Sequence, residues 1–148
     1  MLFRSGYEQY EVSNYAKPGY ACRHNLLYWT NGEYLGCGPS AQSYLDGIRF
    51  GNVADLTVYE TALTASRLPI EDCTRLSNDE QLRDAVIFGL RLTRGIPSQH
   101  LHRLAQNYGH AAVTVQLLAQ QLIEEDGEYS RLSARGRLQA DTIAGLLF

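Results

Sequence analysis

The stretch 14-NYAKPGYACRHNLLYWTNGEYLGCGPSAQSYL-45 combines closely spaced aromatic residues, a Cys-Arg-His-Asn cluster at 22–25 and a glycine-rich loop at 36–43. Such a combination is typical of the wall of a ligand site. The rest of the chain offers no matching acid–base pair, because its acidic groups at 79–84 and 124–126 fall at expected helix ends. The stretch therefore predicts a ligand-contacting segment, and no catalytic residue is assigned.

Composition limits the class of protein. The chain has 148 residues, 45% of them apolar, and a net charge of −3, which suits a folded protein with a core. From Glu71 onward there are eight Arg and no Lys against ten acidic residues, so nucleic-acid binding is not expected. Three cysteines without a close pair, and no apolar run of roughly 20 residues, predict a reduced, cytoplasmic protein without a membrane span.

The sequence pattern of residues 1–51 predicts short strands. Apolar and aromatic residues at 10–14 and at 34–38 favour two of them. Asp46-Gly47 stands between the apolar runs 44–45 and 48–50, and an Asp-Gly pair in that setting predicts a β-hairpin. This half therefore indicates sheet structure.

From residue 52 the apolar spacing becomes helical. Ser77 followed by Glu80 predicts a capping box, with a helix after it. Further helices are expected before Pro69, over 97–109 and over 111–124, then a short strand at 129–132 and a last helix capped by Ser133. This order predicts a helical, winged-helix-like domain over 52–148, and an α/β (α+β) chain overall.

Two groups of residues are candidates for ligand contact. The loop at 36–43 has two glycines that let the backbone turn tightly and small residues that leave room for a flat group such as adenine. The alternative is a turn that merely needs glycine. Cys22 and His24 supply two metal ligands at most, so no metal site is predicted. Their cluster either binds an anion or porphyrin carboxylate, or is structural, with His24 packed against Tyr28 or Trp29.

Several short runs of the sequence, in their order along the chain, indicate a family. The runs Tyr-Glu-Val-Ser-Asn-Tyr-Ala at 10–16, Arg-His-Asn at 23–25, Tyr-Trp at 28–29 and Tyr-Leu-Gly-Cys-Gly at 34–38, with Gly-Leu-Arg-Leu at 89–92 and Gly-Arg at 136–137, match a known pattern. The chain resembles radical S-adenosylmethionine proteins of the oxygen-independent coproporphyrinogen III oxidase-like family, and within it the heme chaperone branch.

The resemblance implies a fold and sites. Residues 1–51 would be the last strands of an incomplete β/α barrel, and 52–148 the HemN-type C-terminal domain. It implies S-adenosylmethionine contacts at Gly36, Gly38, Ser40, Ala41 and Gln42, and substrate or heme contacts at Arg23, His24, Asn25 and Tyr28, all lining one cavity.

Two departures from the family pattern limit what is expected. The family's Cys-x-x-x-Cys-x-x-Cys motif, which holds its [4Fe–4S] cluster, is absent, since the cysteines here are 15 and 36 residues apart. Gln42 also stands where the family often has His. We therefore expect a fragment, inactive alone, that binds neither cluster nor S-adenosylmethionine without a missing N-terminal half, with heme as a possible ligand. The alternative is a stand-alone winged-helix-like module that binds protein or nucleic acid.

Overall fold

The computed structural model describes residues 2–147, and side chains from Arg4 onward. The chain divides into two compact units, one made of the residues up to Asn31 and from Leu82 onward, the other of Gly32–Gln81. Its mixed α/β content confirms the predicted fold class. The expected division at residue 51 concerns family domains and stays a prediction.

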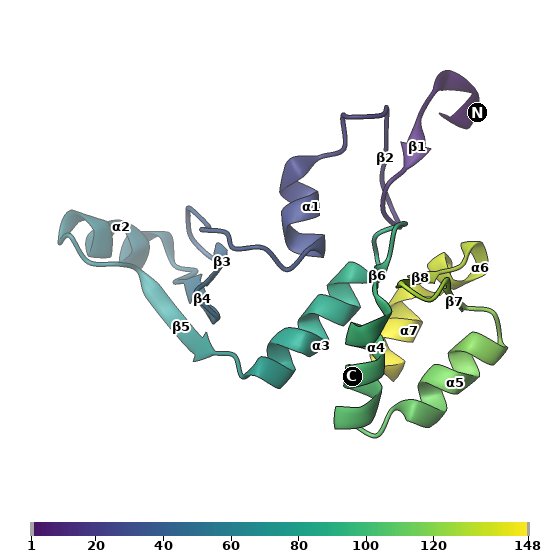
Figure 1. Cartoon of the computed structure of the whole chain (residues 1–148). Coiled ribbons are helices and arrows are strands. Elements are labelled where there is room, and N and C mark those ends of the chain that lie inside the picture. The colour runs from purple at the N-terminus through teal and green to yellow at the C-terminus, as the bar shows by residue number, and fades with distance from the viewer. Residues whose placement is uncertain (1, 148) are drawn as a thin grey trace. The chain divides into compact units, whose positions relative to one another are not determined.

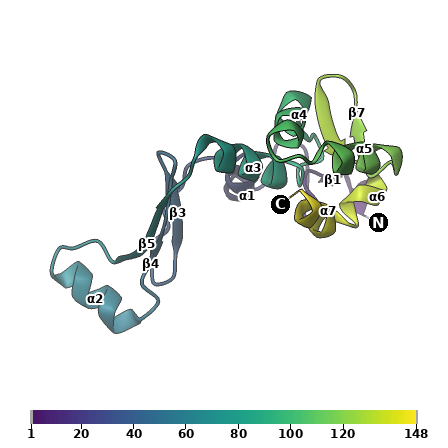
Figure 2. The same cartoon turned by 90° about the horizontal axis from the view of Figure 1, so that it is seen from below.

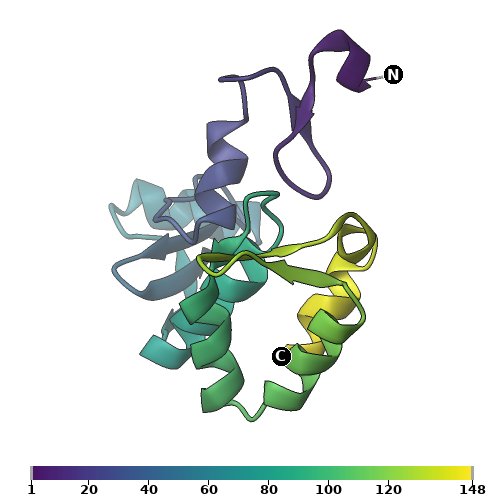
Figure 3. The same cartoon turned by 45° about the vertical axis from the view of Figure 1, so that its right-hand side comes forward.

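The first unit is built around helices and a small sheet (Figure 1). Its central elements are α3 (Asn78–Gly89, which begins in the second unit), β6 (Ile96–Pro97), α4 (Ser98–Asn107), α5 (Ala111–Ala119), β7 (Ile123–Glu125), β8 (Tyr129–Leu132), α6 (Ala134–Arg137) and α7 (Ala140–Leu146). The three strands are antiparallel in the order β6-β8-β7. Figure 3 shows the β7–β8 hairpin lying across the ends of α4 and α5.

One apolar core holds these elements together. Its members come from every central helix except α6 and from all three strands, and those with no exposed surface are Val86, Leu101, Leu104 and Leu147. The predicted caps form as expected. Glu80 N donates to Ser77 Oγ (3.2 Å), and Gly136 N donates to Ser133 Oγ (2.9 Å). Local capping and buried apolar area thus both favour this unit.

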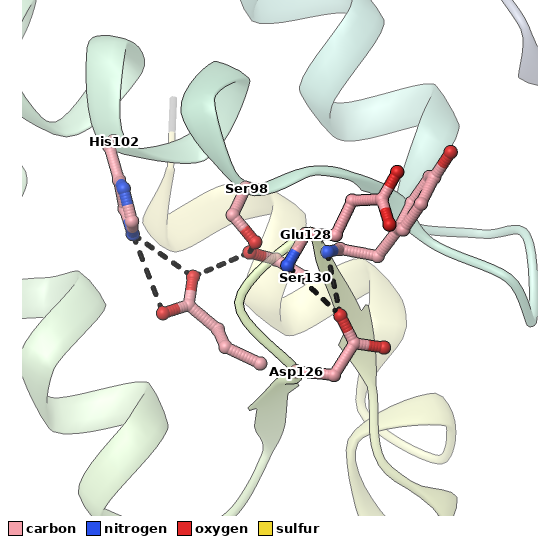
Figure 4. A network of polar contacts seen from close by, with 7 residues as sticks. Ser98, His102, Asp126, Glu128 and Ser130 are labelled. Carbon is pink, nitrogen blue, oxygen red and sulfur yellow. Dashed lines mark hydrogen bonds and ion pairs between the residues drawn. The ribbon is translucent and has the colours of Figure 1, made fainter.

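A polar network joins α4 to the sheet (Figure 4). The buried Ser130 hydroxyl lies 2.5 Å from Glu125 Oε1 and 3.0 Å from Ser98 Oγ. His102 Nε2, on α4, lies 3.1 Å from the same Glu125 oxygen. Since Glu125 stands between the imidazole and the hydroxyl, the network fastens elements together and does not activate a serine.

The turn between β7 and β8 depends on Asp126. Its Oδ1 accepts hydrogen bonds from the backbone N–H groups of Tyr129 (2.8 Å) and Glu128 (3.2 Å), and Arg131 contacts its Oδ2 (3.0 Å). These two backbone hydrogen bonds, assisted by the Arg131 charge, hold the pKa of Asp126 below its usual range.

The N-terminal part of this unit differs from expectation. The strand predicted at 10–14 is wrong: residues 10–14 form the turn between β1 (Glu8–Gln9) and β2 (Tyr15–Ala16). Local bonds shape the turn, because Ser13 N donates to Glu11 Oε1 (2.9 Å) and Tyr10 N to Asn14 O (3.3 Å). Its strand-like pairing is limited to an isolated antiparallel bridge between Glu11 and Leu92. A short helix η1 (Leu2–Ser5) precedes this hairpin, and α1 (Arg23–Trp29) follows it.

The second unit is a three-stranded antiparallel sheet in the order β3 (Gln42–Leu45), β4 (Ile48–Asn52) and β5 (Ile70–Arg75). The predicted hairpin is confirmed, with Asp46 and Gly47 both at positive φ (49° and 70°) as a tight turn requires. Helix α2 (Leu56–Thr64) connects β4 to β5 and stands at one end of these strands (Figure 2). Asp55 caps it through Val58 N (2.9 Å).

One expectation for this unit is wrong, and one strand of it was not predicted. Residues 34–38 form no strand beyond a single bridge between Tyr34 and Tyr44, because Gly36 N turns away to bond the Ser43 hydroxyl (3.0 Å). Strand β5 was not predicted from the sequence. All six of its residues are exposed, and they show none of the apolar alternation that marks a half-buried strand.

Candidate functional site

The predicted cofactor loop lies in the second unit and is held by hydrogen bonds within itself and to other residues of that unit. Gly38 N donates to the Tyr59 hydroxyl (3.1 Å), Ser40 N to Val53 O (3.1 Å) and Ala41 N to Gly38 O (3.3 Å). Gly36 N is bonded to Ser43, as described above. Every backbone N–H at positions 36, 38, 40 and 41 therefore already has an acceptor.

Glycine is required in this loop for two different reasons. Gly38 has a φ of 108°, which side chains rarely adopt, while a methyl group at Gly36 would collide with the backbone oxygen of Gln42. Gln42 itself begins β3, pairs with Gly51, and lays its side chain over that residue. These features match the alternative of a structural turn, and ligand contact by the loop stays a prediction.

Asn52 and Tyr59 hold the loop and were not singled out in the sequence. The Asn52 amide donates to Gly38 O (2.9 Å) and Gly36 O (3.3 Å), and its backbone N–H donates to Ala41 O (2.9 Å). No local pattern marks Asn52, because its partners are 11 to 16 residues earlier in the chain.

The predicted substrate residues lie together on α1, in the first unit. Arg23 and His24 are exposed, whereas Asn25 and Tyr28 are half-buried. Positions 24 and 28 are one helical turn apart, so their side chains meet. The imidazole of His24 stands edge-on to the Tyr28 ring, with centroids 4.8 Å apart and planes at 90°. This packing of His24 against Tyr28 agrees with the alternative that the cluster at 22–25 is structural.

This arrangement gives an exposed imidazole on α1. An edge-on ring contact restricts the orientation of His24 without using its ring nitrogens. An imidazole nitrogen is an ordinary ligand of heme iron. The expectation that α1 and the glycine loop line one cavity stays a prediction, because they belong to separate units.

Beside this pair, α1 ends at the single tryptophan of the chain. Trp29 packs against Phe88 of α3, with ring centroids 6.5 Å apart, and the Arg91 guanidinium lies 4.8 Å from the Trp29 ring centroid. Arg91 was noted only as part of a family-like run, since its partner is 62 residues earlier.

The cysteines do not form a metal centre among residues 2–147. Cys22, Cys37 and Cys73 are all exposed and unbridged. Within the described part of the chain, no three His, Cys, Asp or Glu side chains gather as metal ligands would. Over the same residues, no helix has the length and apolar character to cross a membrane.

Comparison with known proteins agrees with the sequence pattern. The model of the family described as the HemN C-terminal domain matches residues 76–138. The heme chaperone HemW of Mycobacterium tuberculosis is 34% identical over 99% of this chain and 36% of its own length. The HemW of Bacillus subtilis is 32% identical over 95% of this chain and 38% of its own length.

A eukaryotic relative and a solved structure also match this chain over almost its whole length. Mouse radical S-adenosyl methionine domain-containing protein 1, mitochondrial, is 29% identical over 97% of this chain. Escherichia coli coproporphyrinogen III oxidase (HemN), a radical SAM enzyme, has the same fold over 99% of this chain and 38% of its own, with a TM-score of 0.75 at 19% identity. The chain thus spans little more than a third of the length of the proteins it matches.

Proposed function

Because this chain belongs to the family of HemN- and HemW-like radical S-adenosylmethionine proteins, as a C-terminal portion of them, we propose that it serves in heme or porphyrin handling. Its role is to contact heme through α1 for delivery. The heme chaperones among its relatives supply the motive for this choice.

The observation that carries the proposal is the His24–Tyr28 pair. His24 is exposed, and its ring centroid lies 4.8 Å from that of the half-buried Tyr28. This contact orients a ring nitrogen of His24 at the surface. Heme iron takes such a nitrogen as an axial ligand. Asn25 and Arg23 flank it, and a guanidinium suits a porphyrin carboxylate.

Radical chemistry does not fit the residues of this chain. A cluster that activates S-adenosylmethionine needs closely spaced thiolates, and the three cysteines here are separated by 15 and 36 residues. The loop at 36–42 has its backbone N–H groups occupied at four positions. Any S-adenosylmethionine contact at this loop would be made by the small side chains of the loop, packed against the adenine. It would also need a radical SAM portion such as the longer relatives carry.

The helical domain supports the proposal as a scaffold. In our proposal, the helices α3, α4 and α5 with the β6-β8-β7 sheet form a winged-helix-like domain, and the second unit supplies late strands of an incomplete barrel. Nucleic-acid binding is not favoured, because Arg131 is already paired with Glu124 (3.6 Å) and Asp126 (3.0 Å).

Hemin titration tests the proposal. We expect wild-type protein to bind hemin at one site, with quenching of Trp29 fluorescence, and His24→Ala to bind at least about tenfold more weakly through loss of the iron ligand.

The matched control is His110→Ala, because His110 also lies beside a tyrosine, with its ring 6.2 Å from that of Tyr108. It should bind hemin like the wild type. Equal affinity of His24→Ala and wild type would refute the role of α1.

A further inference from the structure

Strand β5 forms one margin of the sheet in the second unit, and its outer side is open (Figure 2). All six residues of β5 are exposed, and among the described residues no strand pairs with it beyond β4. The opposite margin, β3, is partly covered by the bridge between Tyr34 and Tyr44. An open margin presents unpaired N–H and C=O groups that another strand can bind, so proteins usually cover or blunt it. β5 is therefore a candidate interaction surface.

The hydrogen bonds at the end of β5 show which of its backbone groups face outward. Leu76 N donates to Gly47 O (2.9 Å), so the backbone at residue 76 faces the β3–β4 hairpin. Backbone groups alternate in direction along an antiparallel strand. Those of Arg75 therefore face away from β4, and so do those of Cys73.

Charge is distributed unevenly along β5. Glu71 and Asp72 stand at its start, and Arg75 stands at its end. Among the described residues none of these three forms an ion pair, although Arg75 Nη1 donates to Asp46 O (3.3 Å). A copy of β5 that runs antiparallel brings its basic end beside the acidic start, whereas a parallel copy would place like charges together. The strand is thus complementary to itself in one direction only.

One register satisfies both the backbone and the charges. A two-fold axis at Cys73 places this residue opposite its own copy, and Arg75 beside Glu71 and Asp72 of the second copy. An axis at Arg75 would instead oppose two guanidinium groups. A shift in the pairing of β4 with β5 makes Glu71 the extra residue of a bulge, so regular pairing begins at Asp72.

Apolar surface continues past the start of this margin. Leu68 is 80% exposed and, with Val58 and Ile70, lines a groove of about 280 Å³ between α2 and the start of β5. In an antiparallel pair, the residues that follow β5 in the second copy pass beside residues 68–70 of the first. Pairing would therefore withdraw apolar surface from water together with the open backbone groups.

We propose that β5 pairs with β5 of a second copy of this chain, antiparallel about a two-fold axis at Cys73, so that two sheets join through this margin. The closed two-fold arrangement uses the same surface on both copies. Only a short strand on each side is paired, so the complex belongs to the small, transient class of interfaces. This inference is independent of the proposed role in heme handling.

Sedimentation velocity over a range of protein concentrations, up to about 0.2 mM, tests the pairing. We expect the average mass of the wild type to rise with concentration toward that of a dimer. Arg75→Glu, which leaves only acidic charges on the strand, should weaken self-association at least about tenfold. A wild type that stays monomeric over this range would overturn the proposal, and β5 would then be open to a different strand.

Charge exchange separates pairing from damage to the fold. A variant with both Glu71→Arg and Asp72→Arg has only basic charges on the strand and should also fail to self-associate. Mixed one to one with Arg75→Glu, it should form a heterodimer, because an acidic strand then faces a basic one. All three positions are exposed, so the fold should tolerate these changes. A mixture that stays monomeric would contradict the antiparallel pairing.

Cross-linking tests the register. Opposed residues of a hydrogen-bonded antiparallel pair have Cα atoms about 5.5 Å apart, within the range that a disulfide spans. The two proteins to compare retain either Cys73 alone or Cys37 alone, and both cysteines are exposed. Under oxidation by dissolved oxygen with copper phenanthroline, the protein with Cys73 should form the linked dimer at least about tenfold faster. Equal rates would contradict the axis at Cys73.

Discussion

Gly136 lies where the chain after β8 crosses the end of α5, and alanine at this position should destabilise the first unit strongly. A methyl group there would overlap the carbonyl oxygen of Leu122 and come within 2.9 Å of its carbonyl carbon. Both obstacles are backbone atoms. The same carbonyl accepts the N–H of Ser133 (3.0 Å), so it cannot move without breaking that bond.

The size of the effect follows from this geometry. Overpacking of a well-packed site costs about 1–3 kcal/mol. A backbone obstacle places Gly136→Ala at the upper end, near 3 kcal/mol. For a chain of this size that lowers the midpoint of thermal unfolding by about 6–12 °C, at 2–4 °C per kcal/mol.

Urea unfolding followed by Trp29 fluorescence and circular dichroism measures the change. The matched control is Gly145→Ala in α7, where the added methyl group meets nothing within 4 Å. That substitution should stabilise the protein by about 0.5–1 kcal/mol, because alanine favours a helix over glycine. If Gly136→Ala is as stable as the wild type, the close crossing of these segments is wrong.

Three further changes probe single features. Ser77→Ala should cost about 1 kcal/mol through loss of the α3 cap, measured by urea unfolding. Leu101→Ala, at a side chain with no exposed surface, should cost about 3 kcal/mol in the same assay. Asp126→Asn should lower the thermal midpoint at neutral pH. Since the folded pKa of Asp126 is depressed, its contribution is full above the unfolded value of about 3.9 and is lost as pH falls through the folded pKa. A difference between variant and wild type that persists at the lowest pH would contradict this account.

Short-range signals predicted the parts of the fold that local chemistry determines. The Ser77–Glu80 box, the Asp46-Gly47 turn and the Ser133 cap each depend on residues within three positions of one another. Such motifs can be identified directly in a sequence because both partners lie in one short window.

Strand β7 shows where that approach fails. The apolar spacing predicted one helix over 111–124, but α5 ends at Ala119 and Gln121 takes a φ of 55°. Left-handed backbone at a non-glycine residue carries no clear sequence signal. Ile123 is then buried as part of a strand that pairs with β8, a partner formed later in the chain.

The candidate site also has one contact that the sequence predicted and one that it did not. The His24–Tyr28 contact follows from helical spacing and was among the alternatives considered. The contact between Trp29 and Arg91 brings together residues 62 positions apart, and no periodicity connects them. Long-range pairs of this kind require the folded structure.

Spectroscopy of the iron in a one-to-one hemin complex tests the central claim most directly. We predict that resonance Raman and electron paramagnetic resonance spectra report an imidazole ligand in the wild type and in His110→Ala, and that this ligand is lost in His24→Ala. A hemin spectrum that is identical in the wild type and in His24→Ala would contradict the assignment of α1 as the heme-contacting segment.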